Sequence, residues 1–322
     1  MKILVTGATG FVGAALLRRL SGDGADALRA AVRTGGVAVP GGVARVIVPD
    51  VGPDTRWQEA LAGCDAVVHL AARVHIMRDR VADPLAEFRR INVLGTLNLA
   101  RQAADAGVRR FVYVSSVKVN GEASAPGKAF HADDPPNPQG DYALSKLEAE
   151  RGLRELVSTR AVVQAGAGMD VVIIRPPLVY GAGVQGNCLF LMRALARRLP
   201  LPLGAIHNRR SFVALDNLVD LLVLCIHHPL AANQIFLASD GLDLSTTELV
   251  RRLAHAMGKP AHLLPVPAGL LQLGARMVGQ GAVGQRLCEN LQLDISKTRD
   301  LLAWTPPVGV DEGLRSAAGH FQ

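Results

Sequence analysis

The sequence predicts an α/β protein with a Rossmann-type, doubly wound parallel sheet and a smaller mixed C-terminal subdomain. Two observations predict this fold class. Short apolar segments alternate with helix-like segments over residues 1–175, which is the order of a parallel sheet with crossover helices. The first apolar segment also runs into a glycine-rich turn that opens a helical pattern. The expected strands are residues 1–5, 27–33, 43–48, 64–72, 111–114 and 171–175, and residues 83–99 are expected to be helical.

The glycine-rich turn after the first strand reads Thr6-Gly7-Ala8-Thr9-Gly10-Phe11-Val12-Gly13. A glycine turn between a strand and a helix N-terminus presents backbone N–H groups and a positive dipole end to an anion. Gly7 can make the tight turn, Gly10 leaves room for a pyrophosphate, and Gly13 lets the helix lie close to the strand. The turn therefore predicts a dinucleotide site, formed by Gly7, Thr9, Gly10, Phe11, Val12 and Gly13.

The second and third strands are expected to carry the adenosine end of this dinucleotide. The second strand ends at Arg33. A guanidinium at this place suits a 2′-phosphate and favours NADP(H), with NAD(H) also possible, while the alternative is an exposed loop arginine. After the third strand come Asp50 and Val51, which we assign to the cofactor site. Asp50 is expected either to accept a hydrogen bond from the adenine amino group or to cap a helix.

The C-terminal ends of the strands are expected to form one cleft, because ligands of doubly wound sheets bind there. The fourth strand runs through Leu70 into Ala71 and Ala72, whose small side chains would let a cofactor pass closely, and the sixth strand is followed by Pro176. These four residues are therefore assigned to the cofactor site. His69, inside the fourth strand, is expected to be a hydrogen-bonded core histidine and not a ligand.

The helix that follows a long loop at residues 120–141 carries a candidate acid–base residue. Tyr142 and Lys146 lie four residues apart and share a helix face. An ammonium close by would lower the pKa of Tyr142, which is about 10 in a free tyrosine. Ser116, which follows the fifth strand, could bond the same substrate oxygen. These three residues suit proton transfer at a carbinol oxygen while a nicotinamide exchanges a hydride with the carbon, so Tyr142 and Lys146 are also assigned to the cofactor site.

Composition excludes several other classes of protein. The chain has 322 residues, of which 49% are hydrophobic and 20% charged, so a sizeable core is expected. Its net charge of +7 suits anionic ligands, but aromatic residues make up only 4% and give little on which to stack bases, so no nucleic-acid partner is expected. Four widely spaced cysteines indicate no metal site and a reducing, cytoplasmic location. The apolar segments are too short to span a membrane, and the run 269–283 is expected in the core or at a domain interface.

Several motifs together resemble the extended short-chain dehydrogenase/reductase family, in its NAD-dependent epimerase/dehydratase branch that acts on nucleotide sugars. They are residues 6–13, 67–72 (VVHLAA), 91–96 (INVLGT), Ser115-Ser116, Tyr142-x-x-x-Lys146 and Arg175-Pro176. The resemblance implies that Tyr142 is the acid and base, that Lys146 modulates it and binds the ribose, and that Ser116 holds the substrate oxygen. It also implies that Asn92 supports the active-site strands. A homodimer is expected.

The C-terminal half adds to this resemblance and implies a UDP-sugar site. Gly186-Asn187 resembles the segment where these enzymes grip a sugar nucleotide, and Arg209-Arg210-Ser211-Phe212 resembles an element whose arginine, here Arg210, meets the diphosphate. Arg286 is a second candidate phosphate contact at an unusual offset. Lys118 departs from the small or hydroxyl residue often found there, and it is expected either to read the sugar or to point to solvent. The residues assigned to the substrate are Lys118, Asn187, Arg210 and Arg286.

We therefore expect an NAD(P)-binding domain over residues 1–175, with returning elements near 211–240, and an interleaved substrate-binding subdomain over residues 176–322. The first expected function is a 4-keto reductase that acts on a UDP-4-keto-6-deoxy-N-acetylhexosamine and gives products of the UDP-N-acetylquinovosamine or fucosamine type. The alternative is a UDP-hexose 4-epimerase with tightly bound NAD. A third hypothesis, a non-catalytic nucleotide-sensing regulator, is disfavoured because Ser116, Tyr142 and Lys146 are all present.

Overall fold

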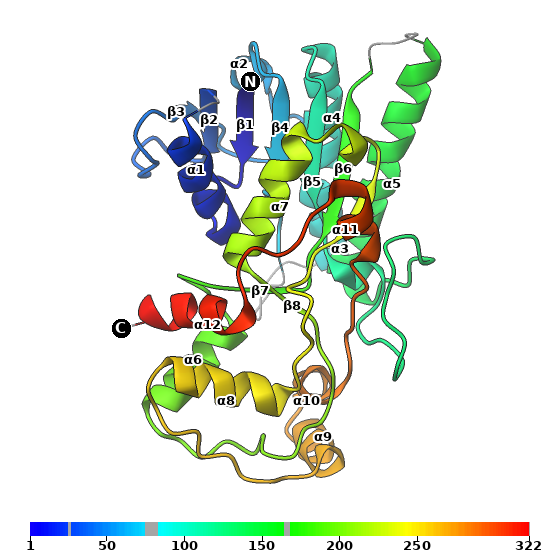
Figure 1. The fold of residues 1–322 in the computed structure, drawn as a ribbon. Helices are drawn as coiled ribbons and strands as arrows, with labels where there is room; N and C mark the ends of the chain where they lie inside the picture. Colours follow the sequence, from blue (N-terminus) through cyan, green and yellow to red (C-terminus); the bar gives the residue numbers. More distant parts are fainter. Residues whose placement is uncertain (25–26, 75–82, 164–167, 322) are drawn as a thin grey trace.

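A computed structural model describes residues 1–24, 27–74, 83–163 and 168–321 of the chain. Within these residues a parallel sheet of seven strands runs in the order β3-β2-β1-β4-β5-β6-β9, with helices on both faces (Figure 1). This order is that of a doubly wound Rossmann sheet, which confirms the predicted fold class. The strands of the sheet are β1 (Lys2–Thr6), β2 (Ala27–Val32), β3 (Ala44–Ile47), β4 (Ala66–His69), β5 (Arg110–Val114), β6 (Asp170–Arg175) and β9 (Ile235–Leu237).

The helices cover the two faces of the sheet in separate layers. On one face α1 (Phe11–Asp23) packs beside α7 (Leu215–His227), and on the other face lie α4 (Thr96–Asp105) and α5 (Gly140–Val163). Strand β1, which lies between β2 and β4, serves both layers, because Ile3 and Val5 belong to the first core while Leu4 belongs to the second. All three side chains are fully buried. This burial on both faces explains why inner strands such as β1 and β4 do not alternate between apolar and polar residues.

The helical stretch predicted at residues 83–99 is real but is not one regular helix. Asp83 caps α3 (Pro84–Phe88) by accepting a hydrogen bond from the Ala86 N–H at 3.0 Å, and proline occupies the first turn. The chain then widens into a π-helix over Arg89–Gly95 before α4 begins. Such widened turns are often found at functional sites, and this one carries Asn92, whose side chain bonds outside the helix.

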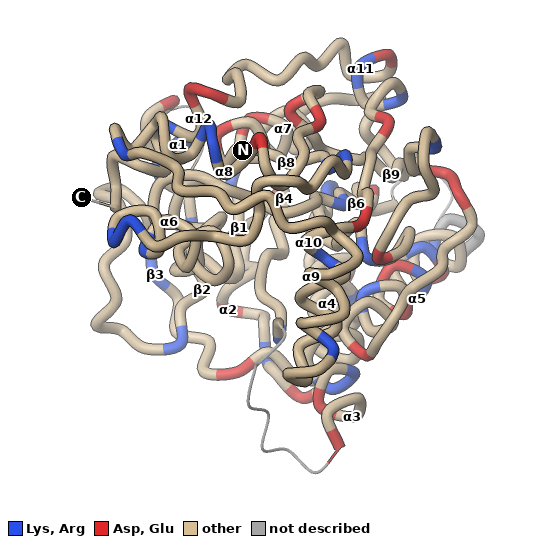
Figure 2. Tube along the Cα trace, turned by 90° about the horizontal axis from the view of Figure 1, so that it is seen from below, with Lys and Arg blue, Asp and Glu red and all other residues tan. Residues whose placement is uncertain are grey.

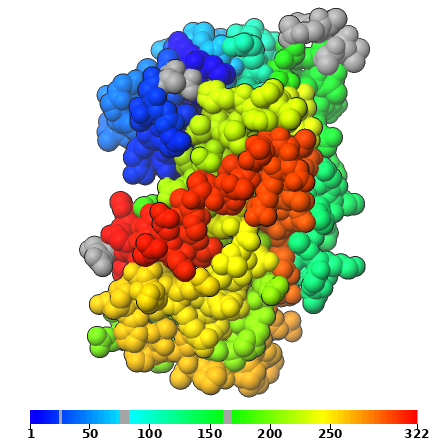
Figure 3. Space-filling model, in the orientation of Figure 1, coloured from blue at the N-terminus to red at the C-terminus, as the bar shows by residue number. Residues whose placement is uncertain are grey.

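Much of the chain after residue 177 forms a second group of elements below the sheet in Figure 1. Two short parallel strands pair in register, and α8 packs against α6 and α12 around a separate apolar core. Figure 3 shows the segment that contains α11 and α12 lying across the middle of the molecule, between the blue N-terminal part and the yellow C-terminal part. The remaining elements are α2 (Gln58–Leu61), a 3₁₀ turn (Val117–Val119), β7 (Leu178–Tyr180), α6 (Asn187–Ala196), β8 (Phe212–Ala214), a 3₁₀ turn (Pro229–Ala231), α8 (Thr246–Ala256), α9 (Ala268–Met277), α10 (Gly281–Cys288), α11 (Ser296–Leu302) and α12 (Val310–Gly319).

Helix α9 is placed differently from the expectation that residues 269–283 lie in the core or at a domain interface. None of its residues is fully buried, and Leu270, Leu273 and Met277 are 62%, 56% and 81% exposed. The helix packs mainly on α10, and both are largely free of charged residues (Figure 2). Across the described residues we find no helix that is both long and apolar enough to cross a lipid bilayer.

His69 is buried at the end of β4, as expected from the sequence. Its Nδ1 lies 2.6 Å from the Thr6 hydroxyl, and its Nε2 lies 3.0 Å from the Thr96 hydroxyl. Burial, and secondarily the charge of Lys146, lowers the pKa of His69 to about 3. The ring is therefore a neutral link between β1, β4 and α4, and both of its nitrogen atoms have partners.

We expect His69 to stay neutral in the folded protein down to a pH of about 3. Because the unfolded chain binds a proton on this ring at a pH of about 6.5, the unfolded state takes up more protons than the folded state between these two values. The stability that this group contributes is therefore present above about pH 6.5 and is lost as the pH falls toward its folded pKa. An NMR titration of the ring checks this, and protonation of His69 near pH 6.5 in the folded protein would contradict it.

Candidate active site

The glycine-rich turn packs tightly against the end of β4. Gly7 has a φ of +64°, and a Cβ atom there would lie 2.8 Å from the backbone nitrogen of Ala71. A Cβ on Gly13 would collide with the carbonyl oxygen of Gly7. Only glycine fits at these two positions, one for the turn and one for the close approach of α1. At Gly10 a Cβ would meet only the Gly7 oxygen, at 3.2 Å.

The same turn fits the pyrophosphate of a dinucleotide. Helix α1 begins at Phe11, so the N–H groups of its first turn, including those of Phe11 and Val12, have no partner within the helix. Thr9 and Gly10 are exposed at the tip of the turn, and Phe11 and Val12 are half-buried beside it. A solvent-facing cradle of glycines at a helix N-terminus is a structural match for an anionic group.

The ends of neighbouring strands bring the other predicted cofactor residues to this edge of the sheet. The Ala71 N–H donates to the Thr6 hydroxyl at 3.3 Å, and Leu70, Ala71 and Ala72 are all half-buried beside the turn. On the other side, the carbonyl of the buried Pro176 accepts a hydrogen bond from the Val117 N–H at 3.0 Å. The glycine turn and these residues therefore follow strands β1, β4 and β6 at their C-terminal ends.

Arg33 lies directly after β2 and is exposed. Within the part of the chain that the structure describes, its guanidinium has neither a hydrogen bond nor an ion pair, whereas Arg45 of β3 donates to the carbonyls of Gly35 and Val37 in the loop that follows Arg33. This geometry leaves Arg33 free to meet a ligand.

Asp50 is neither a helix cap nor a free acceptor in this structure. Its carboxylate accepts a hydrogen bond from Arg90 at 2.7 Å, and this bond lowers the pKa of Asp50. Val51 is half-buried, and its backbone lies against Gly95, where a Cβ would be 3.0 Å away. The helix-cap expectation for Asp50 is wrong, because its carboxylate pairs instead with Arg90, 40 residues later, and sequence patterns do not reveal so distant a partner.

Ser116 and Tyr142 come from two different elements of the fold. Ser116 follows β5 and caps the short turn Val117–Val119 by accepting a hydrogen bond from the Lys118 N–H, while Tyr142 lies in the first turn of α5. The Ser116 hydroxyl acts to lower the pKa of Tyr142. Burial is the stronger effect and raises this pKa to about 12. The expected lowering is therefore not found here, because desolvation of the phenolate outweighs the other influences.

Lys146 lies one helical turn beyond Tyr142 and is 2% exposed. Its Nζ sits 4.2 Å from the centre of the Tyr113 ring, which is a cation–π geometry. Burial lowers the pKa of Lys146 to about 7, while the nearby charge of Glu150 opposes this shift. A lysine with this pKa changes its charge near neutral pH. The spacing of Tyr142 and Lys146 in the sequence does not predict this lowered pKa.

Asn92 ties the helix of Tyr142 to the end of β4. Its amide accepts from the Arg73 N–H at 2.8 Å and donates to the Ser145 hydroxyl at 3.0 Å, and Ser145 donates in turn to the Tyr142 carbonyl at 2.8 Å. Asn92 is 1% exposed. It is therefore placed to hold the strand end and α5 together, which is the arrangement that the resemblance implies.

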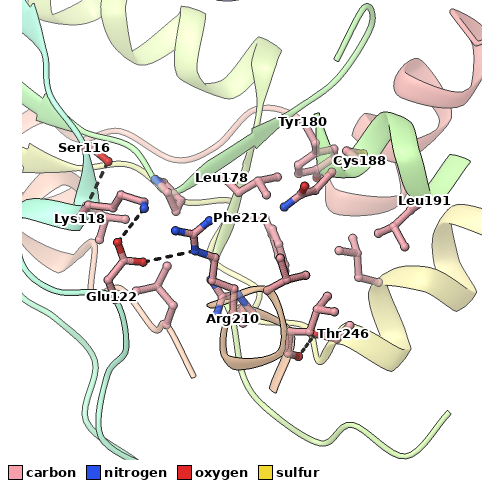
Figure 4. A pocket seen from close by; sticks show the side chains of 18 of the residues that line it. Ser116, Lys118, Glu122, Leu178, Tyr180, Cys188, Leu191, Arg210, Phe212 and Thr246 are labelled. Carbon is pink, nitrogen blue, oxygen red and sulfur yellow. Dashed lines mark hydrogen bonds and ion pairs between the residues drawn. The ribbon is translucent and has the colours of Figure 1, made fainter. Parts of the chain in front are cut away.

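A cavity of about 320 Å³ opens beside Ser116 and extends under α6 and α10 (Figure 4). All four predicted substrate residues line it. Arg210 is largely buried, which lowers its pKa, and its guanidinium donates to the Glu289 carbonyl at 2.9 Å. Asn187 is exposed at the first turn of α6. The cavity is lined in addition by Ser116, Glu122, Leu178, Tyr180 and Phe212, among others.

Glu122 also lines this cavity, although it is not among the site residues predicted from the sequence. Its carboxylate lies 2.7 Å from the ammonium of Lys118 and 3.8 Å from the guanidinium of Arg286. Lys118 therefore does not simply point to solvent. A glutamate four residues after a lysine is a weak signal, and nothing in the sequence links it to a residue more than 160 positions later.

Comparison with known proteins shows the family to which the chain is similar. The sequence profile described as "NAD dependent epimerase/dehydratase family" matches residues 3–238. A Vibrio cholerae protein named UDP-glucose 4-epimerase is 45% identical to this chain, and the alignment covers 99% of this chain and 95% of that protein. A Mycolicibacterium smegmatis protein with the same name is 30% identical over 100% of this chain and 99% of its own length.

Solved structures show the same fold. The structure described as "MoeE5 in complex with UDP-glucuronic acid and NAD" matches with a TM-score of 0.77 and covers 99% of this chain and 98% of its own. The two sequences are 24% identical.

We expect Gly13→Ala to damage the turn, because its new methyl group would collide with the Gly7 carbonyl, and overpacking of this kind typically costs about 1–3 kcal/mol. Gly22→Ala is the matched control: it lies in the same helix α1, and a Cβ there meets nothing within 4 Å. Chemical unfolding of both variants checks the difference. Equal stabilities would show that the contact between α1 and the turn is not tight.

Proposed function

This chain belongs to the NAD dependent epimerase/dehydratase family, and from that premise we propose that it is a 4-epimerase that acts on a UDP-hexose. The observation that carries the proposal is a cavity that Ser116 lines at one end and Arg210 and Arg286 line further along, with Tyr142 near enough to Ser116 for the serine hydroxyl to act on its pKa. From the sequence alone, a 4-keto reductase is the first expected function and the epimerase is the alternative. The name of the Vibrio cholerae relative supports the epimerase alternative better, since the two chains align over nearly their whole lengths.

Arg210 and Arg286 are proposed to hold the diphosphate of the nucleotide sugar. Guanidinium groups recognise phosphate oxygens through paired, charged hydrogen bonds. Arg210 is partly desolvated, and a buried cation of this kind is favoured by an anionic partner. Asn187 is proposed to add a polar contact from the N-terminus of α6. This placement directs the sugar toward Ser116.

Tyr142 is proposed to move the proton at the sugar 4-oxygen, and Ser116 to hold that oxygen in place. With a pKa of about 12, Tyr142 is a neutral phenol at neutral pH and is ready to donate its proton to a ketone oxygen. Taking the proton from the alcohol first requires a lower pKa. We propose that the charged form of Lys146, one helical turn away, supplies that effect when the site is filled, because a ligand that pairs with it would favour its protonation.

A nicotinamide dinucleotide is the proposed cofactor, with its pyrophosphate on Gly10 and the first turn of α1. When bound it would take a hydride from the sugar carbon and return it. An epimerase regenerates its cofactor in every turnover, so the choice between NAD and NADP depends on Arg33 and not on the reaction. Because Arg33 lies directly after β2 and its guanidinium has no hydrogen-bond or ion-pair partner among the described residues, NADP(H) is the proposed preference. A reductase consumes NADPH and must exchange it, so an arginine that binds the 2′-phosphate is also compatible with a reductase. The reductase is therefore the second candidate.

We expect Tyr142→Phe to lower turnover by about 10²–10⁴-fold while UDP-hexose still binds, because the ring is kept and only the transferable proton is lost. Tyr180→Phe is the control: Tyr180 also lines the cavity, but its hydroxyl donates to Asp240 at 2.7 Å and is not proposed to transfer a proton. Steady-state kinetics and binding titrations of both variants measure the effect. Near-normal turnover of Tyr142→Phe on a verified substrate would overturn the mechanism.

A deuteride-labelled nicotinamide distinguishes the two candidate functions in the same assay. Interconversion of two UDP-hexoses with no net consumption of cofactor supports the epimerase. Net transfer of the label to a 4-keto sugar supports the reductase, and in that case the proposed function is wrong.

We expect Arg33→Asp to weaken NADPH binding about ten- to a hundredfold more than NADH binding, because it removes a charged contact to the 2′-phosphate. Arg315→Asp, an exposed position on α12, makes the same change in net charge and serves as the control. Fluorescence titration of both cofactors measures the ratio. If NADH binds the unaltered protein as tightly as NADPH, Arg33 does not read a phosphate.

A further inference from the structure

Three charged side chains form a cluster at the end of the cavity near Ser116 (Figure 4). The Glu122 carboxylate accepts a hydrogen bond from the Lys118 ammonium at 2.7 Å, and its second oxygen lies 3.8 Å from Arg286. Lys118 and Glu122 are 33% and 26% exposed, so both are partly withdrawn from water. Glu122 therefore engages two cations at once, one from its own loop and one from α10.

The position of this cluster places it beside the sugar and not beside the base of the nucleotide. The Lys118 N–H donates to the Ser116 hydroxyl oxygen at 3.3 Å, so the backbone of Lys118 touches the residue that is proposed to hold the reacting oxygen. Arg210 and Arg286 continue the cavity wall away from Ser116. A sugar that reaches from the diphosphate to Ser116 must pass the Lys118 side chain.

The charges of the cavity match a diphosphate that carries a neutral sugar. Among the described residues that line it, the charged ones are Lys118, Arg210, Arg286 and Glu122, which leave a net charge of two positive. A sugar-nucleotide diphosphate carries two negative charges. A uronate sugar would bring a third negative charge, and it would meet a carboxylate and a lysine that is already paired.

We propose that Glu122 determines which sugars the site accepts, by holding Lys118 and cancelling one positive charge, so that neutral hexoses are preferred over hexuronates. This inference rests on the proposed function, because it takes a UDP-sugar as the ligand. Without the carboxylate, the Lys118 ammonium loses its partner and can pair with a sugar carboxylate. Glu122 acts here as a specificity-determining residue and takes no part in the proton transfer.

The test compares the binding of UDP-glucose and UDP-glucuronic acid to the purified protein by calorimetric titration, which needs no turnover. For Glu122→Gln we expect the ratio of the two affinities to move toward UDP-glucuronic acid by about ten- to a hundredfold, the usual effect of one charged hydrogen bond. The ratio is the readout, because removal of a carboxylate strengthens the binding of every anion. Glu312→Gln, at an exposed position of α12, is the charge-matched control and should leave the ratio unchanged.

Two further variants keep the test decisive. The double variant Lys118→Gln with Glu122→Gln should lose the gain, since the freed ammonium is then absent. Glu122→Asp keeps the charge and should keep the preference of the unaltered protein for UDP-glucose. If Glu122→Gln does not fold, Glu122→Asp takes its place in the test. A preference of Glu122→Asp for UDP-glucuronic acid would contradict the proposal.

The outcomes separate this inference from the proposed function. An unchanged affinity ratio in Glu122→Gln, while both UDP-sugars still bind, overturns the role of Glu122 and leaves the epimerase proposal standing. A gain that persists in the double variant also overturns it, because Lys118 would not be the group that reads the carboxylate. Failure of the unaltered protein to bind either UDP-sugar overturns both proposals.

Discussion

The candidate site depends on the buried ion pair between Arg175 and Glu150. Their side chains are 2% and 3% exposed, and the guanidinium donates to the two carboxylate oxygens at 3.0 and 2.6 Å. Arg175 closes β6 and also donates to the Asn120 side chain at 3.1 Å, while Glu150 lies on α5. One pair therefore fixes the helix of Tyr142 against the sheet and against the segment that follows Ser116. Loss of one partner from such a pair typically costs about 3–5 kcal/mol, because a charge is left buried alone.

Most of the fold could be predicted from the sequence, because apolar runs buried on both faces of a sheet are easy to recognise. The last strand, β9, was expected only as a returning element, since three residues are too few to show a pattern. Helix α9 was misplaced because its apolar composition suggested burial, and composition does not say whether a partner covers the helix. The π-helix at Arg89–Gly95 could not be seen either, since its residues continue a helical pattern in the sequence.

The candidate site was predictable where its residues follow local patterns. Ser116 and Tyr142 were expected to act together, and in the structure the Ser116 hydroxyl acts on the pKa of Tyr142. The carboxylates Glu122 and Glu150 were missed, because their partners include residues distant in sequence. The pKa of Tyr142 was expected to fall, yet it rises. Spacing along a helix shows which charges are near, but it does not show how far a side chain is removed from water.

The fold separates the residues that hold the framework from those that contact the variable part of a ligand. Arg175, Glu150 and Asn92 are buried between sheet and helices, whereas Lys118 and Glu122 belong to the segment after β5, and Arg286 to α10. None of the second group belongs to a strand of the sheet. During evolution, the choice of sugar could therefore drift from one relative to the next at little cost in stability, while the proton-transfer machinery stayed the same.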